Sequence, residues 1–173
     1  MPNLRALSIR QPWAWAIFHA GKVVENRDWS GCSIRGPLLL HVGKGCTRAE
    51  YAAGVEAIQA MRADMGLPAT TVPPLDELPR GCIIGVARII RADRHPEVGH
   101  VDARGRDGVV RRLDWARGHV GYRAAGALGL QLADVQELAS VPWKGALGFF
   151  NVPAAQLPGA YWAAWNELAA KES

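Results

Sequence analysis

Side chains able to bind a nucleotide are concentrated in residues 8–29 of the chain. These 22 residues hold two arginines, one lysine, two acids, two amides and three tryptophans. Arginine guanidinium groups donate paired hydrogen bonds to phosphates and base edges, and amides can read the Watson–Crick edge of a base. A tryptophan face can stack on a base, which contributes about 1–3 kcal/mol. The pattern predicts a nucleic-acid-binding site, with these candidates: Ser8, Arg10, Gln11, Trp13, Lys22, Glu25, Arg27 and Trp29.

Residues 22–29 are expected to form a strand, and strand geometry decides which of their side chains can act together. Side chains two positions apart share a face, so Glu25 and Arg27 are neighbours that can form an ion pair. Lys22 can join them only from a turn before the strand, a position that the preceding Gly21 favours. Two interpretations remain open for Lys22 with Glu25: a surface ion pair, or a lysine made reactive by burial near a second charge. Arg27 is either a structural partner of Glu25 or a ligand contact.

The remaining candidates each have a structural alternative. Trp13 recurs at helical spacing with apolar residues, which favours a core position over a stacking platform. Trp29 borders the Ser30-Gly31 turn and is the better stacking candidate. His41 lies in an apolar run and is interpreted first as a hydrogen-bonded interior histidine and second as a ligand residue. Lys144 either faces a phosphate or is a plain turn lysine.

The positive charge of the chain is concentrated in one stretch, from Arg88 to Arg123. This stretch holds nine arginines and five acids, whereas the rest of the chain holds 11 basic and 11 acidic residues. The whole excess of +4 therefore lies there. Such a cationic segment favours phosphate-bearing partners and makes their binding sensitive to salt. The alternative is a solvated, partly disordered loop.

The hydrophobic pattern predicts a single α+β domain over residues 1–173. Thr47 and Glu50 form a capping box at the start of a helix that Gly66 ends, and Asp107-Gly108 marks a possible hairpin turn. Two further helices are expected from Pro12 to Gly21 and from Gly159 onward. Short strands are expected at residues 4–9, 22–29, 38–42, 81–90, 128–138 and 146–152.

Composition excludes several classes of protein. The chain has 173 residues, which is enough to bury a hydrophobic core without the help of disulfides or a bound metal. Its three cysteines form no C-x-x-C pair, which indicates a reducing compartment. No apolar run reaches the roughly 18 residues of a membrane span, and no secretory signal precedes the first strand. We therefore expect a cytoplasmic protein that does not bind membranes. No spacing of histidines, cysteines and acids suits a metal, no phosphate-loop or dinucleotide motif occurs, and we predict no metal and no cofactor.

Several motifs of the chain resemble the ASCH (activating signal cointegrator homology) family, a branch of the PUA-like folds. The most specific block is Leu7-Ser8-Ile9-Arg10-Gln11-Pro12-Trp13-Ala14, followed by the K-x-x-E-x-R arrangement of Lys22, Glu25 and Arg27 and by Arg35-Gly36-Pro37-Leu38. Weaker similarity continues at 79–85 and 141–150, so the resemblance covers nearly the whole chain.

The resemblance implies a small PUA-like β-barrel of mixed strands with flanking helices and a ligand cleft at the K-x-x-E-x-R segment. It also implies binding of RNA, another nucleic acid or a modified nucleoside. The alternative is an amidohydrolase that deacylates an N-acylated cytidine, with Lys22 and Glu25 as catalytic residues. A branch of the family uses a lysine and a hydroxyl residue three positions later, and here a carboxylate replaces that hydroxyl. Whether the protein is an enzyme stays open, as do its protein partners, and a protein-interaction adaptor is a third interpretation.

Overall fold

One mixed β-sheet organises the protein, for which a computed structural model describes residues 1–27, 33–94, 100–104, 110–114 and 128–171. Its six strands follow the order β2-β7-β4-β3-β1-β8. Strands β1 and β3 are parallel and the other neighbours are antiparallel. The strands of this sheet are β1 (Asn3–Ile9), β2 (Val24–Arg27), β3 (Gly36–Val42), β4 (Cys82–Arg94), β7 (Leu128–Pro142) and β8 (Phe149–Pro153). The other elements are α1 (Trp13–His19), α2 (Arg48–Asp64), a separate hairpin of β5 (His100–Arg104) and β6 (Val110–Asp114), a short 3-10 helix (Ala154–Gln156) and α3 (Gly159–Ala170).

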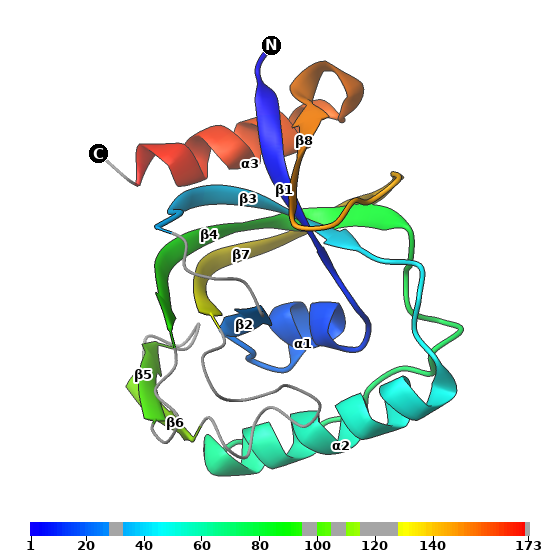
Figure 1. Cartoon of the computed structure of the whole chain (residues 1–173), viewed down its shortest axis with the longest axis vertical. Coiled ribbons are helices and arrows are strands. Elements are labelled where there is room, and N and C mark those ends of the chain that lie inside the picture. The colour runs from blue at the N-terminus through cyan, green and yellow to red at the C-terminus, as the bar shows by residue number, and fades with distance from the viewer. Residues whose placement is uncertain (28–32, 95–99, 105–109, 115–127, 172–173) are drawn as a thin grey trace.

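The sheet curls around α1 and carries α3 on its outer face (Figure 1). Phe18 of α1 packs in one buried cluster with Leu7 and Leu40 on the inner face of the sheet. Tyr161 of α3 packs in a second cluster with Leu39 on the outer face. The long pair β4–β7 contains three register shifts, and such bulges increase the local twist that bends a sheet. The curl brings distant strands toward α1, where the candidate site lies.

Local sequence signals fix the second helix. The hydroxyl of Thr47 accepts a hydrogen bond from the Glu50 backbone N–H at 3.1 Å, and the Glu50 carboxylate accepts one from the Thr47 N–H at 2.8 Å. This is the predicted capping box. The helix then packs on α1, where Ile58 and Ala16 share a cluster, and Gly66 follows its end with a φ of +67°. The expected helix at the C-terminal tail is also confirmed, because α3 begins at Gly159.

The α+β class with mixed strands and flanking helices is confirmed, whereas the predicted β-barrel is not. Within the described residues the sheet is open, because β2 and β8 each pair with one neighbour and not with each other. These edge strands have only 4 and 5 residues, which limits the backbone groups available for closing the sheet. The sheet therefore has two edges.

Several strand boundaries also differ from the prediction. The strand predicted from Lys22 begins at Val24, and β4 and β7 extend to Arg94 and Pro142. Cross-strand pairing between β4 and β7 extends both strands beyond what the local pattern indicates. The expected hairpin is confirmed by the antiparallel pairing of β5 with β6, while Asp107-Gly108 lies outside the described residues.

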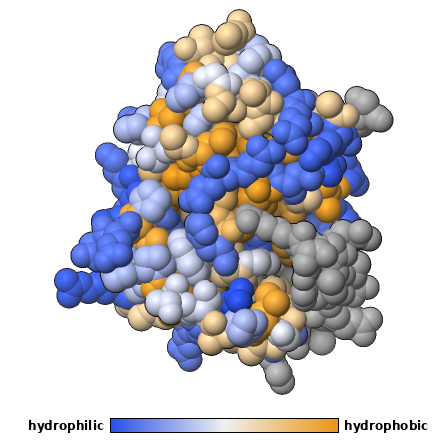
Figure 2. All heavy atoms as spheres, turned by 180° about the vertical axis from the view of Figure 1, so that it is seen from behind, coloured by the Kyte–Doolittle hydropathy of each residue, from blue (hydrophilic) through white to orange (hydrophobic). Residues whose placement is uncertain are grey.

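The described surface is mixed in polarity. Seen from behind, hydrophobic side chains lie between hydrophilic ones rather than forming one continuous face (Figure 2). None of the described helices combines the length and apolar composition needed to cross a membrane. Among the described residues, no three histidine, cysteine or acidic side chains are grouped as a metal site requires.

Candidate functional site

The turn between α1 and β2 directs Lys22 into the protein. Gly21 adopts a φ of +79°, and the backbone N–H of Lys22 donates to the Ala16 carbonyl at 3.1 Å. The Lys22 ammonium then donates to the Glu25 carboxylate, with 2.9 Å between Nζ and Oε2, and to the carbonyl of Val24. Only 5% of the Lys22 side chain is exposed. The structure thus places Lys22 in the turn before the strand and brings it to Glu25.

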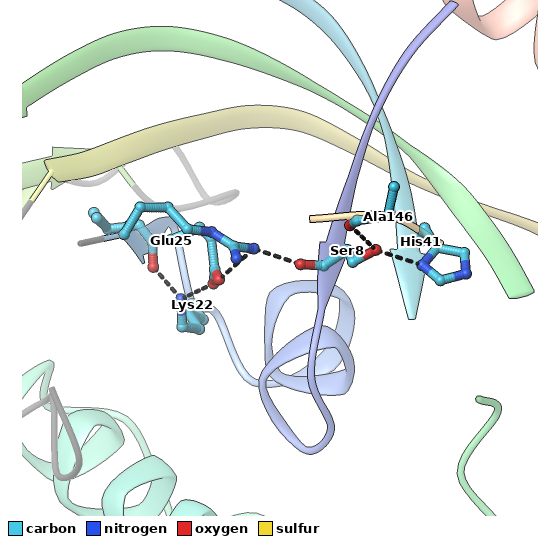
Figure 3. Close-up of polar contacts among 7 residues, drawn as sticks. Ser8, Lys22, Glu25, His41 and Ala146 are labelled. Carbon is cyan, nitrogen blue, oxygen red and sulfur yellow. Dashed lines mark hydrogen bonds and ion pairs between the residues drawn. The ribbon is translucent and has the colours of Figure 1, made fainter. Parts of the chain in front are cut away.

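The Glu25 carboxylate is shared by two cations. Its Oε2 accepts from Lys22, and its Oε1 lies 3.1 Å from Nη2 of Arg27. The same Nη2 donates to the backbone carbonyl of Ser8 at 2.6 Å (Figure 3). Exposure rises from 8% for the Glu25 side chain to 17% for Arg27. Arg27 is therefore the member of this triad that solvent reaches most easily.

Lys22, Glu25 and Arg27 together carry two positive charges and one negative charge. A buried charge is costly unless polar or charged groups compensate it, and the backbone carbonyls of Val24 and Ser8 supply part of that compensation. The arrangement also places a lysine and a carboxylate, two groups that serve as general acids and bases, in direct contact.

Trp13 lies beside the triad. The Lys22 ammonium is 5.8 Å from the centroid of the Trp13 ring, within the range of a cation–π interaction. Trp13 is half-buried and packs against the clusters on both sides of α1. Trp13 is thus neither a wholly buried core residue nor a fully exposed ring on which a base could stack. Trp29, the other stacking candidate, lies outside the described residues.

Ser8 and His41 form a second group on the other side of β1 (Figure 3). The Ser8 hydroxyl lies 2.9 Å from Nδ1 of His41 and 3.2 Å from the Ala146 carbonyl, while Nε2 of His41 lies 3.0 Å from the Trp143 carbonyl. Burial lowers the pKa of the His41 imidazole, although the hydrogen bond to Trp143 opposes this effect. A neutral imidazole that donates from Nε2 to that carbonyl is an acceptor at Nδ1, so the single hydroxyl proton of Ser8 is shared between Nδ1 of His41 and the Ala146 carbonyl.

The segment 143–146 covers this pair closely. A Cβ atom at Gly145 would lie 2.4 Å from Cε1 of His41 and 2.6 Å from the Ser8 hydroxyl oxygen, so the close approach requires glycine. The sequence pattern did not identify Gly145 or the two carbonyls on either side of it, because their partners are more than 100 positions away. His41 is accordingly a hydrogen-bonded interior histidine, as first interpreted. Lys144, in the same segment, is exposed.

Two further candidates make their contacts elsewhere. Arg10 is 67% exposed on its side chain and pairs with Glu50 of α2 at 2.6 Å. The Gln11 amide is buried between the Pro79 carbonyl, 3.0 Å away, and the Trp15 backbone N–H, 3.1 Å away. Gln11 therefore anchors the start of α1. The described contacts link neither residue to Glu25.

Most of the cationic stretch 88–123 lies beyond the described side chains. Arg88 is an exception, because its Nη2 lies 2.7 Å from Oδ2 of Asp134. Lys171 contacts the other oxygen of Asp134 at 3.0 Å. Arg88 therefore links β4 to β7, whereas Arg91 is exposed. The interpretation of the stretch as a phosphate-binding segment stays a prediction.

Sequence comparison connects this geometry to a family. A search of curated proteins returns no match to the chain. The sequence model of the ASCH domain matches residues 7–104, a range that includes Ser8, Lys22, Glu25, Arg27 and His41. Because this match covers more than half of the chain, the protein belongs to the ASCH domain family, within the PUA-like superfamily.

Proposed function

We propose that this protein binds RNA through a ligand cleft at the Lys22–Glu25–Arg27 triad. The observation that carries the proposal is the sharing of one buried carboxylate by two cations, which fixes the orientation of the partly exposed Arg27 guanidinium. A base carbonyl or a backbone phosphate is an acceptor that a guanidinium recognises. Membership of a family proposed to bind RNA, and the basic excess of the chain, support the same conclusion.

The three side chains have different roles in this proposal. Arg27 is the ligand contact, because it is the most exposed of the three and the planar fork of a guanidinium matches the geometry of a phosphate. Glu25 is a positioning residue that orients the guanidinium. Lys22 holds the second oxygen of that carboxylate and adds positive charge. Trp13, beside Lys22, offers part of its ring to a neighbouring base.

Binding of a fluorescent single-stranded RNA, followed by anisotropy, tests this proposal. We expect Arg27→Met to weaken binding at least tenfold, and Arg27→Lys to weaken it less because the positive charge is kept. Arg48→Met is the matched control, since Arg48 is an exposed arginine on α2 away from the triad. Circular dichroism would verify that each variant is folded. Equal affinities of folded Arg27→Met and Arg48→Met would overturn the proposal.

An amidohydrolase is the second candidate, favoured by the 2.9 Å contact between the Lys22 ammonium and Glu25 in a buried position. In this reaction water adds to the acyl carbon of an N-acylated cytidine and the C–N bond breaks, which yields cytidine and a carboxylic acid. Lys22 would act on the acyl carbon or the water, and Glu25 would carry the proton to the leaving amine.

Turnover separates the two candidates. The hydrolase requires release of cytidine from N-acylated cytidine, detected by chromatography, and its loss in both Lys22→Met and Glu25→Gln. Binding of RNA without any release would leave Lys22 and Glu25 with a positioning role only. Release that persists in both variants would place the chemistry elsewhere.

A further inference from the structure

An open polar pocket lies at the other end of β1 from the triad. Its volume is about 380 Å³, within the range of roughly 300–1,000 Å³ that small-molecule sites have. Figure 1 shows the elements concerned, with α3 lying over β3 on the outer face of the sheet. The side chains that matter for its chemistry are Asn3 and Arg5 of β1, Arg35 just before β3, Asn151 of β8 and Trp165 of α3.

Two arginines give the cavity a positive wall. Arg5 donates one hydrogen bond to the Arg35 carbonyl at 3.4 Å, and Arg35 donates one to the Ile90 carbonyl. Among the described residues, neither guanidinium lies within 4.0 Å of a carboxylate. Each guanidinium has five N–H donors, so most of them remain available for a ligand. Two cations without an acid between them favour a ligand of about two negative charges, which a phosphate monoester supplies.

The other side chains suit a flat, polar ring. Trp165 is half-buried, so part of its indole ring is accessible as a stacking surface on the cavity wall. Asn3 and Asn151 are exposed, and within the part of the chain that the structure describes their amides have no hydrogen-bond partner from another side chain. Amides of this kind can pair with the donors and acceptors on a base edge or on a ribose. Phosphate binding and ring stacking are thus available in one cavity.

We propose that this cavity binds a single nucleotide, with Arg5 and Arg35 on the phosphate and Trp165 against the base. Arg5 precedes Ser8 by three positions on β1, about 10 Å along the strand, and the described contacts do not connect the cavity to Glu25. The inference therefore does not depend on the function proposed for the triad. The nucleotide is either free or the terminal residue of a strand, since both present the same phosphate and base.

Nuclear magnetic resonance titration tests the site on the whole chain. Comparison with Trp165→Phe assigns the Trp165 indole N–H signal, whose shift then reports binding of adenosine 5′-monophosphate. We expect this probe to bind at least tenfold more tightly than adenosine or inorganic phosphate alone. Absence of any shift, or equal affinity for the nucleotide and for inorganic phosphate, would overturn the proposal.

Variants then identify the phosphate contacts. Arg5→Met and Arg35→Met should each weaken nucleotide binding at least tenfold, and Arg5→Lys should restore part of the loss through its charge. Arg48→Met is the matched control and should bind as the unmodified protein does. Affinity that is unchanged in Arg5→Met and Arg35→Met would show that the arginines are not the ligand contacts. Binding of a short oligonucleotide that carries a 5′-phosphate would show that the pocket accepts the end of a strand as well as a free nucleotide. For either ligand the proposal requires that removal of the phosphate weaken binding.

Discussion

Arg27 donates to the backbone carbonyl of Ser8 with 2.6 Å between nitrogen and oxygen, and this contact joins the first strand of the sheet order to the fifth. In a flat sheet, strands this far apart would be separated by about 19 Å. The contact exists because the sheet curls around α1 (Figure 1). Within the described residues, a side chain rather than backbone pairing thus bridges β2 and β1 on the concave face of the open sheet.

The ion pair inside the triad should contribute strongly to stability. Lys22→Met and Glu25→Gln each break a buried pair, and losses of about 3–5 kcal/mol in the free energy of unfolding are usual for such changes. Glu25→Gln should cost more, because it leaves two cations without their shared carboxylate. The double variant should lose less than the sum of the single losses, by about 0.5–3 kcal/mol.

Urea unfolding of the unmodified protein, the two single variants and the double variant gives the coupling free energy between Lys22 and Glu25. Arg10→Met provides the comparison with a solvent-exposed ion pair. The Arg10–Glu50 pair is 67% and 46% exposed on its two side chains, so its loss should cost only about 0.2–1 kcal/mol. A Lys22→Met loss as small as that of Arg10→Met would contradict the structural role assigned to the triad.

Gly145 should tolerate no side chain. Gly145→Ala places a Cβ 2.6 Å from the Ser8 hydroxyl oxygen and 2.4 Å from the His41 ring, so the covering segment must move. We expect a loss of about 1–3 kcal/mol, measured as a lower thermal midpoint. Gly45→Ala is the matched control, because a Cβ at Gly45 has no neighbour within 4 Å. Similar midpoints for the two variants would mean that the segment adjusts freely.

His41 should make stability depend on pH in one direction. Burial lowers its pKa in the folded state below the ordinary 6.5, so the unfolded chain binds more protons between these two values. The contribution of His41 is therefore fully present above about pH 6.5 and is lost as the pH falls through the folded-state pKa. The free energy of unfolding should decrease over that interval.

The difference in unfolding free energy between the unmodified protein and His41→Gln isolates this effect. The glutamine amide can still donate to the Trp143 carbonyl but does not titrate. We expect the difference to narrow as the pH falls below about 6.5. A difference that does not change with pH would show that His41 does not couple folding to protonation.

The cationic stretch should control the salt dependence of RNA binding. Replacing the arginines at 104, 106, 111, 112, 117 and 123 with glutamine should flatten the plot of log affinity against log salt concentration. The expected change in slope is about 0.7 for each phosphate of a single strand that is no longer neutralised. The double variant Arg48→Gln, Arg80→Gln is the control, because it removes positive charge outside the stretch. An unchanged slope would show that these arginines do not contact phosphate.

Contacts between near neighbours along the chain could be predicted from the amino-acid sequence. The Thr47–Glu50 capping box, the pairing of Glu25 with Arg27 and the turn that presents Lys22 each join residues within three positions of one another, so spacing alone indicates them. The family also follows from the sequence, since its motifs lie in continuous segments.

Contacts between distant segments depend on how the chain folds. Arg27 reaches Ser8, His41 and Ser8 meet Gly145, and Arg5 shares a cavity with Trp165, all because the sheet curls and its faces are covered. The open sheet could not be predicted from the sequence pattern either, because it depends on which strands pair. The exposure of Arg10 depends on how α2, which carries its partner Glu50, packs in the fold. Spacing along a chain gives the face on which a side chain lies, whereas its partner across the fold depends on how the whole sheet bends.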